Sequence, residues 1–400
     1  MDKAIPAMLN ELPKPPVISL TSGPVSVYPR VLEALARPVN YDYDDYFQQF
    51  YEAVNRKVTT ALRSEQPALI LHAEPAVGLE AAAASLISGE DIVLNLVSGV
   101  YGKGFGYWAA RHAAELLEVE VPYNEAIDPQ QVADALADRP DVTVVSLVHH
   151  DTPSGTVNPA NEIGAVVQRH GALFLVDAVS SFGGMDTHPG DCHADLYVTG
   201  PGKCLGGPPG LTIAAVSARA WDHMAAHPGR PRDSVLSLTD WKDAWRHDKP
   251  FPFTPSVAEM NGLDGAIEQY LQEGPETVWR RHRLTARACR AGVVAMGCEL
   301  WPAREAIAAD TTTAVRVPDG MDDGEIRAAA RARFGVVLSA GRHDTAGKLI
   351  RIGHMGPVAE PIYATVAVTA LGGALRQVGF PADVGAGVEA AMAVIEAEGN

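Results

Sequence analysis

Short apolar runs alternate with helix-length amphipathic segments between about residues 66 and 216. Strands that alternate with helices in this way predict a mostly parallel, seven-stranded sheet. The near-continuous apolar character of 142–148 and 172–179 is typical of strands covered by helices on both faces, so we expect these two at the centre. The seven predicted strands are ALILH (68–72), DIVLNLV (91–97), LLEVEV (116–121), VTVVSLV (142–148), ALFLVDAV (172–179), DLYVTG (195–200) and LTIAAVS (211–217).

Beyond about residue 275 the pattern predicts a smaller sheet with helices on one face. We expect an N-terminal arm (1–25), a large α/β domain (26–275) and a small C-terminal α+β domain (276–400). The Pro-rich stretch around 249–255 is a candidate boundary or interface arm. The helices expected in the C-terminal part are 278–296, 322–334 and 361–379, and the strands are 311–317, 335–339 and 348–353.

Composition narrows the class of protein. With 47% hydrophobic and 20% charged residues among 400, the chain is expected to be globular rather than disordered. A formal net charge of −17 would repel a phosphate backbone, so nucleic acid is not an expected partner. No leader-like or membrane-spanning apolar run stands out, which predicts a cytoplasmic protein that does not enter a membrane. The four cysteines have no C-x-x-C spacing and are expected to be reduced.

Two side chains at predicted strand ends point to chemistry on a pyridine ring. Asp177 closes the run ALFLVD, and Lys203 follows DLYVTG in a glycine-flanked turn. In an open parallel sheet, both positions lie at the edge where ligands bind. A carboxylate can keep a pyridine nitrogen protonated, and a lysine amine can form a Schiff base with an aldehyde on that ring. Each residue alone has an ordinary alternative, Asp177 as a helix cap and Lys203 as a surface charge.

Two further post-strand segments could hold such a ring. Tyr101 in SGVYGKGFG could stack on the ring face, and Thr152 in HHDTPSG could hydrogen-bond its phenolic oxygen. Each could equally be a core aromatic or a turn residue. The cluster His149, His150 and Asp151 invites a metal interpretation, but no second cluster in the sequence completes a site, so we expect no metal.

Taken in order, the segments HAEPAVGLEAA, SGVYGKGF, HHDTPSGT, VDAVSSFGG, VTGPGKCLGGPPG and FTPS resemble class V aminotransferases of the pyridoxal-phosphate fold type I superfamily. The resemblance spans nearly the whole chain. It implies Lys203 as the Schiff-base lysine, Asp177 under the ring nitrogen, Tyr101 as the stacking ring and Thr152 near the phenolic oxygen. It also implies a homodimer or homotetramer, because family members bury their sites between subunits.

The segments NYDYD, PYNEAIDP, DKPFPFTPS and RIGHMGP resemble those members of the family that transfer an amino group from pyridoxamine to pyruvate, giving pyridoxal and L-alanine. In such members pyridoxal and pyridoxamine are substrates, and no cofactor stays bound. The resemblance further implies Arg351 in KLIRIGHMG and Arg342 in SAGRHDT as ligands of the pyruvate carboxylate. A guanidinium fork suits that role, although a surface salt bridge is the alternative for each.

Glu74 is where the sequence departs from relatives that use a phosphorylated cofactor. There, small residues at the first βα turn bind the phosphate through backbone N–H groups. Here the turn reads HAEPA (72–76), with a carboxylate at the anion position and a proline that lacks an N–H. We therefore expect Glu74 to accept a hydrogen bond from the uncharged hydroxymethyl of pyridoxamine and to repel its phosphate, the alternative being a simple helix cap. Lys103 is the nearest cation that could bind a phosphate here. In relatives, the threonine that corresponds to Thr254 of FTPS reaches the cofactor phosphate from a neighbouring subunit.

Three alternatives stay open at this point. An alanine–glyoxylate or serine–pyruvate aminotransferase with permanently bound pyridoxal phosphate would keep the same fold. A nicotinamide-dependent oxidoreductase could share the α/β pattern, but the glycines at 102, 104 and 106 give G-x-G-x-G rather than G-x-G-x-x-G. A non-enzymatic binding module would leave the pairing of Asp177 with Lys203 without a purpose.

Overall fold

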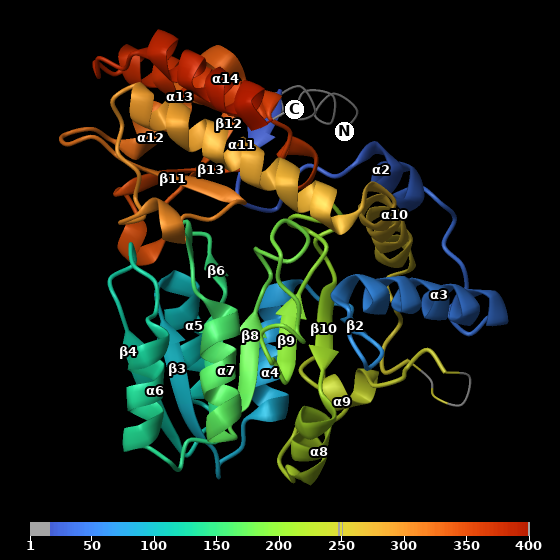
Figure 1. The fold of residues 1–400 in the computed structure, drawn as a ribbon. Helices are drawn as coiled ribbons and strands as arrows, with labels where there is room; N and C mark the ends of the chain where they lie inside the picture. Colours follow the sequence, from blue (N-terminus) through green and yellow to red (C-terminus); the bar gives the residue numbers. More distant parts are fainter. Residues whose placement is uncertain (1–16, 247–248, 250, 399–400) are drawn as a thin grey trace, which may run out of the picture.

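A large sheet forms the lower part of the molecule in Figure 1. The computed structural model describes residues 17–246, 249 and 251–398. The seven strands of this sheet lie in the order β2-β10-β9-β8-β5-β3-β4. They are β2 (Leu69–Leu71), β3 (Ile92–Val97), β4 (Glu115–Glu120), β5 (Val144–Val148), β8 (Leu173–Asp177), β9 (Leu196–Thr199) and β10 (Thr212–Val216).

Each of the seven predicted strands is a strand of this sheet, so the predicted fold class is confirmed. Strands β9, β8, β5, β3 and β4 run parallel, and β10 is antiparallel to both β9 and β2. The central strands β5 and β8 are buried along their whole length, as their apolar sequences predict. The carboxyl ends of the parallel strands therefore share one edge of the sheet.

Helices cover both faces of the sheet. Helices α6 and α7 lie on one face, and α4 and α5 lie on the other (Figure 1). The alanine-rich α4 begins at Pro75, whose fixed φ suits the first helical position, and Glu74 is its N-cap. These helices are α4 (Pro75–Leu86), α5 (Val100–Ala109), α6 (Pro129–Asp138) and α7 (Ala160–His170). The other helices of this part are α2 (Pro29–Leu35), α3 (Asp45–Leu62), α8 (Ala218–Ala226), α9 (Leu238–Trp241) and α10 (Val257–Glu273).

A second sheet, with the strand order β1-β12-β13-β11, lies toward the C-terminal end of the chain. The three C-terminal strands were predicted, but β1 was not. It pairs in parallel with β12, with Ile18 opposite Val336. Residues 18–20 of the predicted N-terminal arm thus join this sheet, and residues 1–16 lie outside the described residues. The strands are β1 (Ile18–Leu20), β11 (Thr312–Arg316), β12 (Val336–Ala340) and β13 (Leu349–Gly353).

The C-terminal helices pack against one another beside the smaller sheet (Figure 1). A separate apolar core, which includes Leu20 of β1, joins these helices to that sheet. Helix α12 illustrates the local signals, because Asp322 caps its start and Gly335, at φ 67°, ends it. These helices are α11 (Pro275–Ala295), α12 (Asp323–Phe334), α13 (Ile362–Gln377) and α14 (Val384–Glu398), the last of which was not predicted.

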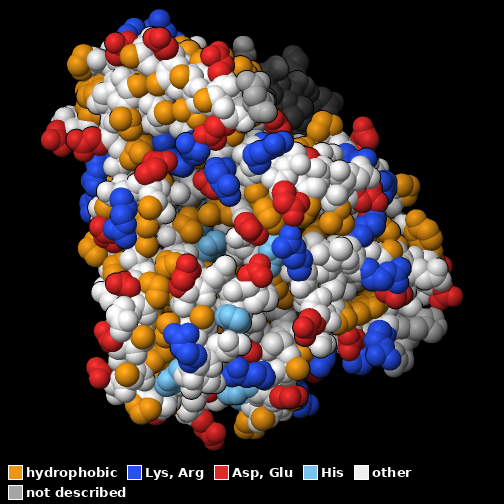
Figure 2. Space-filling model, viewed as in Figure 1, with side chains coloured by type: hydrophobic (Ala, Val, Ile, Leu, Met, Phe, Trp, Pro, Cys, Tyr) orange, Lys and Arg blue, Asp and Glu red, His pale blue; other side chains and the backbone are white. Residues whose placement is uncertain are grey.

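The surface carries charges of both signs. Acidic and basic side chains are interspersed over the face shown in Figure 2, with apolar side chains between them, singly and in small groups. No helix among the described residues combines the length and apolarity needed to cross a bilayer. The four cysteines are free and buried. Of the DKPFPFTPS segment, residues 248 and 250 lie outside the described residues.

Candidate active site

Lys203 follows β9 in a turn at the carboxyl edge of the large sheet. Its Nζ donates a hydrogen bond to the backbone oxygen of Ser22, 2.5 Å away. Burial penalises the charged ammonium, and the nearby positive charge of Arg351 adds to this, so the pKa of Lys203 falls to about 8. Near neutral pH a usable fraction of the side chain is therefore an uncharged amine that can act as a nucleophile or base.

The segment after β1 closes over this amine. A Cβ built on Gly23 would lie 2.1 Å from Lys203 Nζ, and Gly23 has a φ of +120°, which side chains rarely adopt. Only glycine fits at this position. Ser22 and Gly23 were not predicted as part of the site, because they reach it through the pairing of β1 with β12.

Asp177 lies at the carboxyl end of β8 and is 7% exposed. Its Oδ1 accepts a hydrogen bond of 2.9 Å from the backbone N–H of Val179. Burial of the carboxylate, together with the negative charge of Asp151, raises the pKa of Asp177 to about 7, against the opposing effects of Val179 and Lys203. A buried carboxylate of this kind gains most from a cationic partner such as a protonated ring nitrogen.

Asp151, rather than its two histidine neighbours, supports the site. Its Oδ2 accepts a hydrogen bond of 2.7 Å from the backbone N–H of Tyr101, at the first turn of α5. Burial raises the pKa of Asp151 to about 6, although backbone N–H groups of α5 stabilise its charge. His149 directs Nδ1 to Ser181 Oγ (2.8 Å), whereas His150 directs Nδ1 to the oxygen of Thr156 (2.9 Å). Asp151 was not among the predicted site residues.

A cavity of about 470 Å³ lies between the two sheets. Five of the seven predicted site residues line it, namely Glu74, Tyr101, Asp177, Lys203 and Arg342. Additional lining side chains that the sequence analysis missed include Ser180, Phe105 and Trp108. Phe105 and Trp108 follow Tyr101 on α5 at helical spacing, a signal that could have found them.

Thr152 and Arg351 are not among the lining residues and instead contact each other. Arg351 Nη1 lies 3.5 Å from Thr152 Oγ1, and its Nε donates to the oxygen of Ala340 at 2.7 Å. Arg351 is 7% exposed, and burial lowers its pKa. Arg342 is exposed and places Nη1 3.4 Å from the hydroxyl of Tyr101. The two guanidinium groups thus approach the site from β13 and from the segment after β12.

Glu74 occupies the N-terminus of α4. Its Oε2 accepts from the backbone N–H of Ala76 at 3.1 Å, and its backbone oxygen accepts from Val77 and Gly78 at 3.0 and 3.2 Å. Pro75 has no N–H to offer. The N–H groups of this first turn are therefore all engaged by Glu74 itself, and a carboxylate stands at the positive end of the helix.

The two residues considered for phosphate binding are placed elsewhere. Lys103 donates from Nζ to Glu118 Oε2 at 2.6 Å and to Glu120 Oε2 at 3.1 Å, and it does not line the cavity. Thr254 is exposed and is likewise absent from the lining. Lys103 is thus already paired with two carboxylates on β4.

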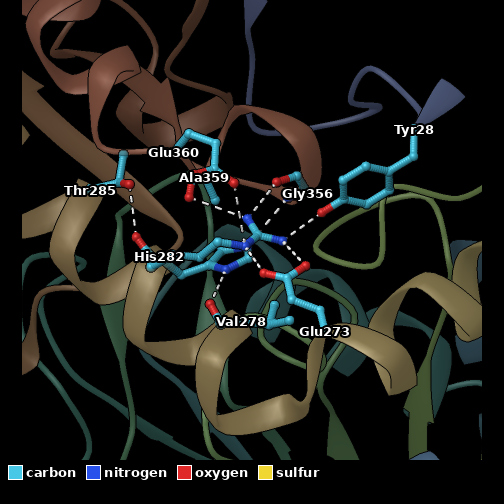
Figure 3. A network of polar contacts seen from close by, with 9 residues as sticks. Tyr28, Glu273, Val278, His282, Thr285, Gly356, Ala359 and Glu360 are labelled. Atoms are coloured by element: carbon cyan, nitrogen blue, oxygen red, sulfur yellow. Dashed lines mark hydrogen bonds and ion pairs between the residues drawn. The ribbon is translucent and has the colours of Figure 1, made fainter. Parts of the chain in front are cut away.

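Arg281 on α11 connects the segments that surround the turn of Lys203 (Figure 3). Its Nη1 donates to the backbone oxygens of Gly356 (2.9 Å) and Ala359 (3.2 Å). Its Nη2 donates to the hydroxyl of Tyr28 at 2.6 Å, and its Nε donates to Glu273 Oε1 at 2.5 Å. One buried guanidinium therefore bonds to acceptors from three separate parts of the chain.

Two of those partners touch the turn itself. The backbone N–H of Tyr28 donates to the oxygen of Gly206 at 3.2 Å, and Gly206 donates to the oxygen of Lys203 at 2.9 Å. Gly356 packs so closely that a Cβ on it would lie 2.9 Å from Gly206 Cα. Arg281 thus braces the backbone that carries the reactive amine.

Known proteins are similar to this chain in fold and in sequence. The family model described as aminotransferase class-V matches residues 80–368. A pyridoxamine–pyruvate transaminase of Mesorhizobium japonicum is 64% identical over 383 residues, which is 96% of this chain and 98% of that protein. The crystal structure of pyridoxamine–pyruvate aminotransferase from Mesorhizobium loti has a TM-score of 0.95 at 64% identity and covers the same shares. The ureidoglycine–glyoxylate aminotransferase of Bacillus subtilis, at 28% identity, has a TM-score of 0.91 over 96% of this chain and all of that one.

Proposed function

Because the chain belongs to the class V aminotransferases, we propose that it transfers the amino group of pyridoxamine to pyruvate, giving pyridoxal and L-alanine. The 64% identity to a transaminase named for these two substrates supports this choice within the family. The structural observation that carries the proposal is the position of the Glu74 carboxylate at the N-terminus of α4.

This position of Glu74 favours binding of pyridoxamine over its 5′-phosphate. A phosphate at this helix end would need free N–H groups, and those of Ala76, Val77 and Gly78 already bond to Glu74. A phosphate would also lie beside an ionised carboxylate. A hydroxymethyl group instead donates a hydrogen bond to Glu74. A site that relies on such a bond discriminates strongly between the two forms.

The remaining lining residues fit a pyridine ring. When bound, the ring supplies the electron sink for moving a hydrogen between two carbons. Asp177 holds the proton on the ring nitrogen, and Tyr101 packs against the ring face. Thr152 donates its hydroxyl toward the phenolic oxygen once Arg351 turns to its ligand. Lys203, with its pKa lowered to about 8, carries the proton between C4′ of the ring and Cα of the pyruvate-derived carbons.

Arg351 and Arg342 bind the pyruvate carboxylate in this proposal. The buried Arg351 offers a fork whose Nη1 now makes only a long contact of 3.5 Å with Thr152. No described carboxylate forms an ion pair with this guanidinium, and the carboxylate of pyruvate would supply one. The exposed Arg342, held near the Tyr101 hydroxyl, can close over the site from the segment after β12.

We further propose that no cofactor stays bound, so pyridoxal and pyridoxamine enter and leave as substrates. The alternative is an alanine–glyoxylate or serine–pyruvate aminotransferase that keeps pyridoxal phosphate. To separate the two, dialysed protein is incubated with pyruvate and either pyridoxamine or its 5′-phosphate, and alanine is assayed. We expect alanine in amounts that match the pyridoxamine consumed, and little with the phosphate. Alanine formation that requires bound pyridoxal phosphate would refute the proposal.

A homodimer or homotetramer is the assembly we propose. Tyr41, Tyr43 and Tyr46 lie close together in the chain and expose their rings, which suits a surface that a second copy covers. Light scattering coupled to size-exclusion chromatography measures the mass directly, and a monomer at micromolar concentration would contradict the proposal. The cytoplasmic location stays a prediction from the sequence.

A further inference from the structure

The connection between β8 and β9 carries a histidine between two aspartates. His188 Nδ1 lies 3.3 Å from Asp191 Oδ2 and 3.6 Å from Asp186 Oδ1. One ligand atom from each of the three residues lies within 4.8 Å of the others. None of the three lines the cavity that contains Lys203. The cluster is therefore separate from the proposed active site.

His188 is held with this nitrogen facing the two carboxylates. The side chain is 2% exposed, and Nδ1 makes no hydrogen bond of normal geometry. Its ring packs against Trp279 of α11, with ring centroids 5.5 Å apart and planes at 64°. Its backbone oxygen accepts from the N–H of Cys192 at 3.3 Å, which fixes the local turn. Nδ1 therefore faces two carboxylate oxygens within 3.6 Å without a well-formed hydrogen bond, and a buried polar atom in that state costs free energy.

The spacing of the three atoms suits a metal ion. With metal–ligand distances near 2.1 Å, two ligands of a tetrahedral ion lie about 3.4 Å apart. The two distances from His188 bracket that value. A neutral imidazole nitrogen and two carboxylate oxygens at this spacing are donors that a cation can share.

The charges around the cluster also favour a divalent cation. Asp186 and Asp191 are both exposed, so an ion can reach them from solvent. The positive charge of Arg63 acts on His188, but Arg63 lies over the ring of Trp279 at 5.5 Å and places Nη2 3.4 Å from Glu276 Oε1. That carboxylate offsets much of the arginine's charge. Two aspartates therefore leave a local excess of negative charge.

We propose that Asp186, His188 and Asp191 bind a divalent transition-metal ion. One imidazole and two carboxylates suit Zn²⁺, Co²⁺ or Mn²⁺ better than Ca²⁺ or Mg²⁺, which prefer oxygen ligands throughout. Water completes the coordination. The ion links residues on both sides of the turn from 186 to 191, within the connection between β8 and β9.

Titration calorimetry of the full-length, chelator-treated protein with ZnCl₂ tests this proposal. The variants are Asp186→Asn and Asp191→Asn, both at exposed positions where the fold tolerates the change. The matched control is Asp222→Asn, which removes the same charge from the exposed face of α8. We expect one Zn²⁺ per chain for the wild type and the control, and binding at least about tenfold weaker for the two cluster variants.

Two further readouts keep the result specific. Added Co²⁺ gives the visible absorption of a nitrogen- and oxygen-bound ion in the wild type, and Asp191→Asn loses it. Transaminase activity stays unchanged in both cluster variants, because neither residue touches the cavity. Equal Zn²⁺ affinity in the wild type and both cluster variants would overturn the proposal. Absence of Zn²⁺ binding by the wild type would do the same and would identify the cluster as an ion pair.

Discussion

Replacing Glu74 with glutamine tests the basis of vitamer selection. The amide keeps an oxygen that can accept from the Ala76 N–H, so the cap of α4 and the fold are preserved. Only the negative charge is removed. We expect the change to weaken the binding of pyridoxamine modestly and to strengthen the binding of pyridoxamine 5′-phosphate greatly.

The magnitude follows from the distance between the charges. Two unit charges 4 Å apart interact with about 1 kcal/mol in a water-like medium and about 4 kcal/mol at an effective dielectric of 20. A phosphate dianion doubles these values. Because Glu74 is exposed, the lower limit applies, and the variant recovers about 2 kcal/mol, or roughly 30-fold in affinity for the phosphate. The hydroxymethyl group exchanges a charge-assisted hydrogen bond for a neutral one, at a cost of about 1 kcal/mol.

Steady-state kinetics with both amines give the ratio of kcat/KM that decides the matter. Glu80→Gln is the matched control, because Glu80 lies on the same helix but pairs with Arg111 at 3.0 Å rather than facing the cavity. We expect the ratio to shift toward the phosphate in Glu74→Gln alone, and more so at low salt. The same ratio in both variants and the wild type would refute the electrostatic argument.

Three other predictions concern the amine and its surroundings. Lys203→Met abolishes turnover, and residual turnover would contradict the role given to this lysine. The same change raises the free energy of unfolding at pH 7 by up to about 3 kcal/mol, because burial lowers the pKa of Lys203 from 10.5 to about 8 and so penalises its charged form. Urea unfolding measures this gain, which shrinks as the pH rises from 8 to 10.5. The pKa of Asp177 is about 7 in the free protein, so kcat/KM for pyridoxamine falls as the pH drops through 7. Asp177→Asn lowers the plateau of kcat/KM about 100-fold or more and removes this fall at acid pH. If the fall persists in the variant, another group is responsible for it. Gly23→Ala lowers kcat at least about tenfold by displacing Lys203 Nζ, whereas Gly89→Ala, with open space around its Cβ position, leaves kcat unchanged; equal kcat in both would refute the close approach.

Local patterns determined how much of the architecture could be predicted. The runs 142–148 and 172–179 are apolar throughout, and β5 and β8 lie side by side at the centre of the sheet as expected. Post-strand position alone brought Asp177 and Lys203 to one edge. The short strand β1 escaped prediction because its three residues carry no periodic signal, and its partner β12 lies far along the chain.

Side-chain direction could not be predicted in the same way. Thr152 and Arg351 contact each other rather than lining the cavity, and only the packing of the smaller sheet decides this. Asp151 follows the same strand end as Thr152, yet its role in holding α5 depends on the close approach of Gly99 to its carboxylate. The residue roles inferred from the family resemblance stay predictions until the variants are measured.

The pairing of β1 with β12 has a consequence for the order of events during synthesis. The backbone oxygen and the glycine that enclose Lys203 belong to the first 25 residues, but β1 has no partner until Val336 has been made. At about 5 to 20 residues per second, a ribosome needs at least some 15 seconds to travel that far. Lys203 itself is made within this interval, and until Val336 follows it 133 residues later, roughly 7 seconds or more at the same rates, it keeps the ordinary basicity of an exposed side chain. A nascent chain therefore carries no activated amine, and the reactive group arises only when translation is nearly complete.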